Sequence, residues 1–518
     1  MTVYKGTIIS VDANNGIYGY LVEDKGRIVF VGDALPDIYA NFAVTELNEG
    51  AMLPAFVDTH SHFASFAVLA TTVRLNNAKS NKEILEILKK SDDNLKKGKT
   101  ILAYGAHSRV EEGQLITKAE LDPLFPKRIV IIITNDGHSA VLNSAALKKM
   151  PESLSTVRGY NYDTGIMKNE AFYRAADNLP KVLDKLDVLS AFQDAIDEYV
   201  SKGVGTVHAM SGSGFPRDMD VDFLTWLARG QDSGFQMRIF IQSFDTAKAT
   251  KRKLPRIGGC FKTALDGSIT SRDAAMLEPY EGTDNKGILY YSDEELFDNI
   301  DRANRQGLQI QMHAIGDAAF AQGTRVLKRA LDAYPRDDHR HGLIHSTLNT
   351  EEGIQICKDY NIQILAQPAF LIPEVLEYMY KALGDRLYKG EQYKTFLDNG
   401  IVLSAGSDAP VTMPEPLEWI YKACNHPNEA QRVTLEQAIR MCTYNGCYAT
   451  FDEKKRGSLE VGKIADMVII DKNPYNTPIN KLKDIKVVNT ILSGRFYQPK
   501  KKNIIATIIK GMLKKGVC

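Results

Sequence analysis

The decapeptide Leu53-Pro54-Ala55-Phe56-Val57-Asp58-Thr59-His60-Ser61-His62 leads from an apolar run into two histidines spaced two residues apart. The apolar run, residues 53–57, predicts a buried strand. Side chains two apart in an extended segment point to the same side, so His60 and His62 can converge on one divalent ion. Imidazole suits zinc and other borderline metals. The pair alone is weak evidence, because this spacing also arises by chance.

Seven more apolar runs follow, alternating with helical stretches, and this alternation indicates a parallel α/β sheet or barrel. The eight predicted strands are residues 53–57, 203–209, 237–242, 260–265, 308–313, 342–345, 362–367 and 401–405. A (β/α)₈ barrel needs about 250 residues. The region 51–455 is longer, so we expect a distorted barrel with an insertion at about 68–190, after the first strand.

Polar groups stand at the ends of several predicted strands. His313 and His345 close two of them, and Asp408 follows the strand at 401–405. A barrel gathers its catalytic residues at the C-terminal ends of its strands. Four histidines and one carboxylate in these positions are hard to explain as core packing, so the pattern predicts a metal site.

Two other residues of the fourth predicted strand need an interpretation. Lys262 lies inside an apolar run, where a buried amine is costly unless it is paired or modified. It is either a lysine at a strand edge that reaches water, or a neutral amine that reacts with carbon dioxide to form a carbamate bridging two metals. Cys260, like Cys357, is interpreted as a small core residue, because no pattern pairs it with a base.

Composition narrows the class of protein. The 518 residues carry 64 basic and 64 acidic side chains, which gives no electrostatic reason to expect nucleic acid or a membrane as partner. The six cysteines are scattered, which suits a reducing compartment. No signal pattern opens the chain, and its apolar runs fall far below the roughly 20 residues that span a bilayer. We expect a soluble, cytoplasmic protein without a stable membrane span.

The two ends of the chain share a β-rich texture. Neither end has enough strands for a stable sheet, so residues 1–50 and 456–497 are predicted to form one composite β domain. Residues 498–518 form a basic amphipathic tail, with isoleucines on one helical face. This tail can be a membrane-surface helix, a docking helix or a frayed end, and the sequence does not choose among them.

The chain resembles the amidohydrolase superfamily and, within it, the YtcJ-like group that includes N-substituted formamide deformylases. The resemblance covers residues 3–495 and keeps the order of the family's motifs. The matching stretches are 53–62, Asp136-Gly137-His138, 165–171, 261–268, His313-Ala314-Ile315-Gly316-Asp317, His345, Gln367-Pro368, Gly406-Ser407-Asp408-Ala409-Pro410 and 457–466.

The resemblance implies a distorted (β/α)₈ barrel with a composite β-sandwich domain, and a divalent metal, expected to be zinc. His60 and His62 would bind the first metal, and His313 and His345 the second. Asp408 would touch the first metal and act as the catalytic acid/base. Lys262, if carboxylated, would bridge two ions, and Glu170 of the insertion is the rival bridge.

The implied activity is hydrolysis of an amide or other C–N bond of a small molecule by metal-activated hydroxide. Two other functions stay open: decarboxylation or C–C cleavage on the same metals, and a non-catalytic scaffold. His138 is either a substrate contact or a surface histidine. A homo-oligomer, dimer or tetramer, is expected from the resemblance.

Overall fold

The computed structural model describes residues 1–518 except 71, 76, 97, 107–112, 135–138, 177, 180–181, 214, 500–503 and 515–518. The chain divides into two compact units. The first contains Met1–His62, Ile196–Ser211 and Phe223–Cys518, and the second contains Phe63–Ala195 and Gly212–Asp222. Among the described residues, no helix is both long enough and apolar enough to cross a membrane.

A parallel barrel sheet is the centre of the first unit. In the described chain its eight strands are β5 (Phe56–Ser61), β11 (Val204–Ser211), β12 (Gln236–Ile241), β13 (Arg256–Gly259), β14 (Gln309–Ala314), β15 (Gly342–His345), β16 (Gln363–Ala366) and β17 (Leu403–Ala405). The edge strands β5 and β17 approach each other where they end, since Asp408 N donates to His60 O and His62 N donates to Ala409 O, both at 2.8 Å. The predicted barrel is confirmed.

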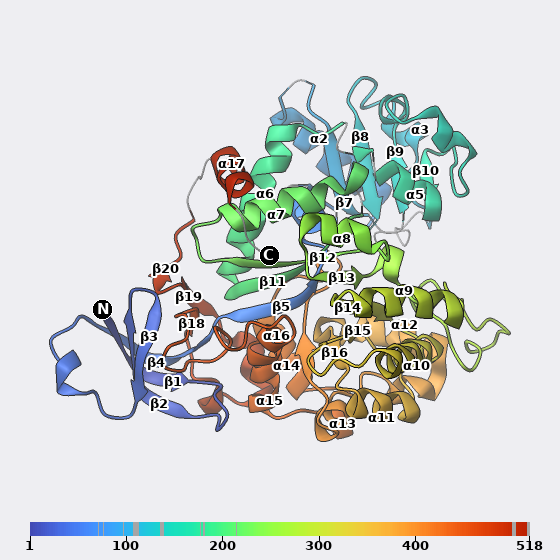
Figure 1. The fold of residues 1–518 in the computed structure, drawn as a ribbon. Helices are drawn as coiled ribbons and strands as arrows, with labels where there is room; N and C mark the ends of the chain where they lie inside the picture. The colour runs from blue at the N-terminus through green and yellow to red at the C-terminus, as the bar shows by residue number, and fades with distance from the viewer. Residues whose placement is uncertain are drawn as a thin grey trace. The chain divides into compact units, whose positions relative to one another are not determined.

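Amphipathic helices cover the outside of this barrel (Figure 1). Helices α6 (Lys185–Ser201) and α7 (Met219–Gly230) run through both units, and the first unit also contains α8 (Thr246–Arg252), α9 (Asp293–Arg305), α10 (Asp317–Ala333), α11 (Glu351–Asp359), α12 (Pro373–Leu383), α13 (Tyr393–Asp398), α14 (Pro416–Cys424), α15 (Leu435–Met441), α16 (Tyr444–Tyr448) and α17 (Ile504–Leu513). Helix α10 buries Phe320, Leu327 and Leu331 on one face. Ser292 and Glu295 form a capping box that begins α9.

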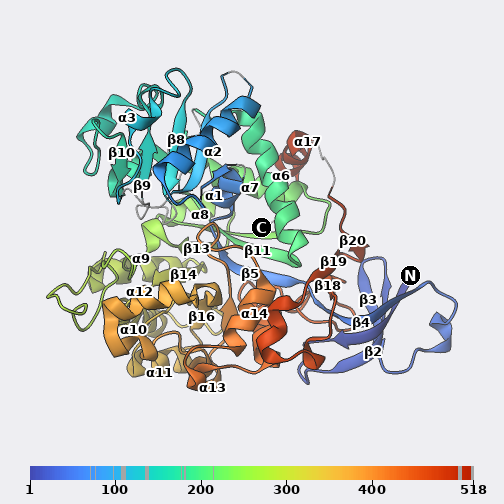
Figure 2. The same ribbon diagram turned by 180° about the vertical axis from the view of Figure 1, so that it is seen from behind.

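The second sheet of the first unit joins both ends of the chain. Its strands, in order, are β20 (Arg495–Phe496), β19 (Val487–Leu492), β18 (Met467–Ile470), β4 (Val44–Pro54), β1 (Thr2–Ile9), β2 (Ile17–Asp24) and β3 (Arg27–Gly32). Figure 2 shows the red β18 beside the blue β4. Tyr4, Ile8, Met52, Met467 and Ile491 share one buried core. The composite domain predicted from the two ends is confirmed.

Two predicted strands differ from the observed ones. The run at 53–57 is divided: Leu53 and Pro54 end the composite-sheet strand β4, whereas Phe56 and Val57 begin the barrel strand β5. The fourth strand is β13, Arg256–Gly259, so the strand predicted at 260–265 is wrong. Glycine is needed at position 258 of β13 because a Cβ there would lie 1.8 Å from Gln311 O of the neighbouring β14.

The second unit has a sheet of its own. Its described strands, in order, are β10 (Ile166–Lys168), β9 (Ser139–Leu142), β8 (Val130–Thr134), β7 (Ile101–Ala106) and β6 (Val73–Arg74). Its helices include α1 (Phe63–Ala70), α2 (Asn81–Asn94), α3 (Lys118–Leu121), α4 (Ser144–Leu147) and α5 (Asn169–Ala176). This unit begins immediately after β5, and the insertion predicted after the first barrel strand is therefore present.

Candidate metal centre

One half of the centre comes from the two edge strands of the barrel. His60 lies on β5, whose residues are all buried, and His62 follows directly. Their Nε2 atoms lie 3.1 Å and 3.2 Å from the same oxygen of Asp408, Oδ1. The contacts between His60, Asp408 and Ala409 that bring β5 and β17 together also hold these three side chains in one place.

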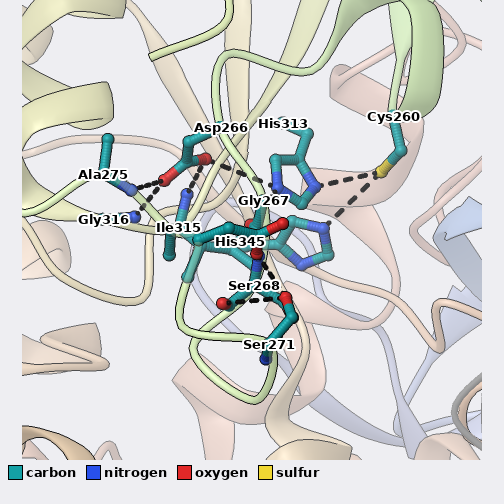
Figure 3. Close-up of polar contacts among 12 residues, drawn as sticks. Cys260, Asp266, Gly267, Ser268, Ser271, Ala275, His313, Ile315, Gly316 and His345 are labelled. Atoms are coloured by element: carbon teal, nitrogen blue, oxygen red, sulfur yellow. Dashed lines mark hydrogen bonds and ion pairs between the residues drawn. The ribbon is translucent and has the colours of Figure 1, made fainter. Parts of the chain in front are cut away.

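The other half comes from β14 and β15 together with Cys260, the residue after β13 (Figure 3). The sulfur of Cys260 lies 3.3 Å from His313 Nδ1 and 3.7 Å from His345 Nε2. It also lies 3.4 Å from His60 Nε2, which belongs to the first half. Cys260 therefore stands between the two pairs of histidines.

The protonation of His313 is set by its backbone surroundings. Its Nε2 lies 2.9 Å from the carbonyl oxygen of Gly267, and because a carbonyl only accepts, Nε2 carries the proton. The other ring nitrogen, Nδ1, faces the sulfur of Cys260 at 3.3 Å. Asp266 fixes this loop by accepting hydrogen bonds from the backbone N–H groups of Ile315 (3.0 Å) and Gly316 (2.8 Å), as Figure 3 shows.

Two residues of the centre adopt an uncommon backbone conformation. His345 has φ 68° and Asp408 has φ 57°, both in the left-handed region that side chains other than glycine rarely adopt. Such strain costs about 1–3 kcal/mol per residue and persists only where the surrounding structure imposes it. At the ends of β15 and β17 it turns these two side chains toward the centre.

The ionisable side chains of the centre shift one another's pKa values. Burial alone would lower the pKa of His60, but Cys260 and Asp408 raise it to about 10. Burial would raise the pKa of the Cys260 thiol, but the charges of His60 and His313 hold it well below its usual value. Two anionic groups thus face several histidines, and a divalent cation would balance the same negative charge.

The donor set fits a metal. Three groups of ligand atoms, each within 4.8 Å of one another, occur among the described residues: His60, His62 and Cys260; Cys260, His313 and His345; and His60, His345 and Asp408. Within the same residues Asp408 Oδ1 is buried yet lacks a partner with hydrogen-bond geometry. Imidazole, thiolate and carboxylate are zinc ligands, and a buried carboxylate oxygen that faces two imidazole nitrogens suits coordination.

A sequence profile described as the amidohydrolase family matches residues 43–497. The chain belongs to this family. Its members depend on metals, and the buried histidines, Cys260 and Asp408 of this amidohydrolase fit that requirement. The chain is accordingly an enzyme of the hydrolase class.

Relatives of this amidohydrolase match nearly its whole length. YtcJ of Bacillus subtilis (strain 168) is 26% identical over 88% of this chain and 90% of its own. An N-substituted formamide deformylase of Arthrobacter pascens is 24% identical over 95% of this chain and 97% of its own. The crystal structure of a metal-dependent hydrolase from Pyrococcus horikoshii OT3 has the same fold, with a TM-score of 0.76 and 22% identity over 92% of this chain and 99% of its own.

Five of the residues expected to ligate metal in this amidohydrolase are brought together, namely His60, His62, His313, His345 and Asp408. Lys262 is not among them, because it lies in a 3₁₀ turn, Phe261–Thr263, with an exposed side chain. Glu170 belongs to the second unit, where its exposed carboxylate pairs with Arg174 at 3.1 Å. His138 lies outside the described residues.

Cys260 was missed by the sequence analysis. The signal was available, since Cys260 follows a barrel strand just as the histidines do, but placing that strand at 260–265 put the cysteine at its start. His208 on β11 stays outside the three ligand groups and contacts Thr450 Oγ1 at 3.2 Å.

Proposed function

We propose that this amidohydrolase cleaves an amide or other C–N bond of a small molecule, with Asp408 as general acid and base. The observation that carries the proposal is the convergence of His60, His62, His313, His345 and Asp408 at the C-terminal ends of the barrel strands, where barrel enzymes hold their catalytic groups.

The chemistry divides between the metal and the chain. When bound, divalent metal supplies water activated near neutral pH and polarises the scissile carbonyl. His60, His62, His313 and His345 would hold the metal, and the burial of His60, His62 and His345 limits access of bulk water to it. Asp408 takes a proton from the attacking water and returns it to the leaving amine, a transfer that needs hydrogen-bond reach of both groups. Phe261, 40% exposed and 4.9 Å from the His62 ring, offers an apolar contact for substrate.

The relative named N-substituted formamide deformylase indicates which substrates to test first. Simple N-substituted formamides and amides should be incubated with the zinc-loaded chain, and the amine and carboxylate products identified. Release of carbon dioxide or a product of C–C cleavage would favour the alternative reactions on the same metals. A chain that binds metal but converts none of these compounds would favour the scaffold.

Asp408 can be tested separately. Asp408→Asn should lower kcat/KM for an identified substrate by at least about 100-fold, because general acid–base catalysis contributes 10²–10⁴-fold. Metal content must be measured on the same samples, since Asp408 faces the ligand histidines. Asp398→Asn, an exposed carboxylate paired with Lys394, is the control. Full activity of the Asp408→Asn enzyme would remove this role.

The finer expectations remain predictions. They are zinc as the metal, two ions if Lys262 is carboxylated, Glu170 as a rival bridge, and His138 as a substrate contact. Elemental analysis of protein purified without chelator tests the first two. A homo-oligomer and a cytoplasmic location also remain predictions, the former testable by light scattering.

A further inference from the structure

We propose that the thiolate of Cys260 is the ligand shared by two metal ions in this centre, in place of a carboxylated Lys262. The inference rests on the proposed function, since it concerns the same metals, but it is tested by metal binding and not by turnover.

The position of Cys260 carries the argument. Its sulfur belongs to two of the three groups of convergent ligand atoms, with His60 and His62 on one side and His313 and His345 on the other. A ligand that belongs to both groups is positioned to bridge two ions, which lie about 3.5–4 Å apart in two-metal sites. The thiol is only 7% exposed, so it is held inside the centre.

The distances fit coordination. Tetrahedral zinc, with bonds of about 2.3 Å to sulfur and about 2.0 Å to nitrogen, separates these two ligand atoms by about 3.5 Å. The sulfur of Cys260 lies 3.4 Å from His60 Nε2, 3.3 Å from His313 Nδ1 and 3.7 Å from His345 Nε2. Coordination of a metal by the sulfur and by each ring nitrogen accounts for all three separations with one donor set.

The local backbone separates Cys260 from Lys262. Residues two apart share a side in a strand, but the chain leaves β13 at Gly259 and continues as a 3₁₀ turn. Phe261 has φ 49°, and Lys262 O accepts a hydrogen bond from the Tyr291 hydroxyl at 2.9 Å. The thiol is thereby buried among the histidines while the lysine side chain is exposed.

Chemical consequences follow from a thiolate bridge. On binding, sulfur coordinates as the thiolate, and the protons that the facing histidines hold in the absence of metal pass to solvent. Assembly of the centre then needs no carbon dioxide, whereas a carbamate on Lys262 does. Thiolate also favours zinc, cobalt or cadmium over magnesium or manganese.

The experiment loads the full chain, stripped of metal with a chelator, with Co²⁺ alone in carbonate-free buffer. Near-ultraviolet absorption detects cobalt–thiolate charge transfer, and elemental analysis counts the ions. The wild type should bind about two ions per chain and show the charge-transfer band. Cys260→Ala should lose the band and at least one of the ions.

Two variants separate the alternatives. Lys262→Met should keep both ions and the band without bicarbonate. Cys357→Ala removes a buried thiol outside the ligand groups and should keep both as well. Circular dichroism checks that each variant is folded.

Three results would overturn the proposal: a cobalt-loaded wild type without the charge-transfer band, unchanged metal binding in Cys260→Ala, or loss of the second ion in Lys262→Met with a requirement for bicarbonate in the wild type. The first needs no variant, so a misfolded Cys260→Ala does not leave the question open. Hydrolysis that continues after any of these results would leave the proposed function standing.

Discussion

Two buried aspartates of the barrel show how neighbours set the state of the same side chain. Burial raises the pKa of Asp58 to about 6, even though its carboxylate accepts hydrogen bonds from Ser407 Oγ at 2.6 Å and Ser407 N at 2.9 Å. For Asp408, burial is outweighed by His60 and His62, which hold its pKa well below the usual value. Asp58 joins β5 to the segment after β17, and Asp408 faces the metal ligands.

Glu391 is a buried acid outside the metal centre, and it predicts a pH dependence of stability. Burial raises its pKa from 4.5 to about 7, against the lowering effects of Tyr393 and Thr347. The native state then keeps this proton between pH 4.5 and 7 while the unfolded state releases it, so stability falls as pH rises through this window. The loss is about 3 kcal/mol at most. Glu391→Gln cannot ionise and should lose less stability.

Urea unfolding of wild type and Glu391→Gln at pH 5 and pH 8 measures this difference. Glu281→Gln, which alters an exposed side chain, should retain the pH dependence of the wild type. If Glu391→Gln loses as much stability as the wild type between the two pH values, Glu391 is not the group responsible.

At the scale of elements, strand ends were the most informative part of the sequence. Seven barrel strands overlap their predicted ranges. The apolar run before each of His60, His313 and His345 forms a buried strand, and the histidine therefore lies near the end of that strand. The exception is β13, whose Arg256-Ile257-Gly258-Gly259 has too little apolar content to stand out. Glycine is required at position 258 because of a contact with the neighbouring β14, and the sequence around Gly258 does not reveal this contact.

Gly258→Ala should therefore destabilise the barrel by about 3 kcal/mol or more, because two costs act together. Gly258 has φ 117°, which side chains rarely adopt, and a Cβ would meet Gln311 O. Chemical denaturation of the purified variant gives the change in the free energy of unfolding.

Gly307 supplies the matched control. It also has a positive φ, 75°, but a Cβ there meets nothing within 4 Å. Gly307→Ala should cost only about 1–2 kcal/mol, the conformational part of the effect. Equal costs at the two positions would mean that the close approach of Gln311 O adds nothing to the conformational cost of the substitution.

At the scale of the whole molecule, the sequence predicted the composite β domain because the residues at both ends of the chain are typical of strands. The exact residue limits of the predicted domains stay predictions. The sequence allowed three interpretations of the tail: a membrane-surface helix, a docking helix or a frayed end. In the structure its helix α17 packs against α7. A Cβ on Gly511 would lie 1.7 Å from Trp226 O, and one on Gly230 would lie 1.9 Å from Thr507 O. Gly230 and Gly511 lie within helical segments that carry no other mark of a contact, so the sequence could not predict that α17 packs on α7.

Gly511→Val should separate α17 from α7, since the valine side chain has no room against Trp226. Proteinase K should then cut the tail at least about tenfold faster, because the undocked segment exposes its backbone, while the thermal unfolding midpoint of the barrel changes little. Mass spectrometry of the fragments locates the cuts.

Lys510→Ala is the control for Gly511→Val. It removes only an exposed ion pair with Asp232, and such pairs contribute about 0–1 kcal/mol. Its tail should be cut at the wild-type rate. A Gly511→Val tail as resistant as the wild type would show that the close helix contact does not hold α17.

Because β4 pairs with β18, the sheet that joins both ends of the chain cannot be completed until late in translation. Strand β4 is synthesised early and gains β1 at once, but its other neighbour begins at Met467, after the whole barrel has been translated. Until then β4 presents an unpaired edge that can pair with another chain. A message truncated before β18 would therefore yield a chain with all its metal ligands and a permanently open edge, a product for chaperones and proteases rather than a smaller enzyme.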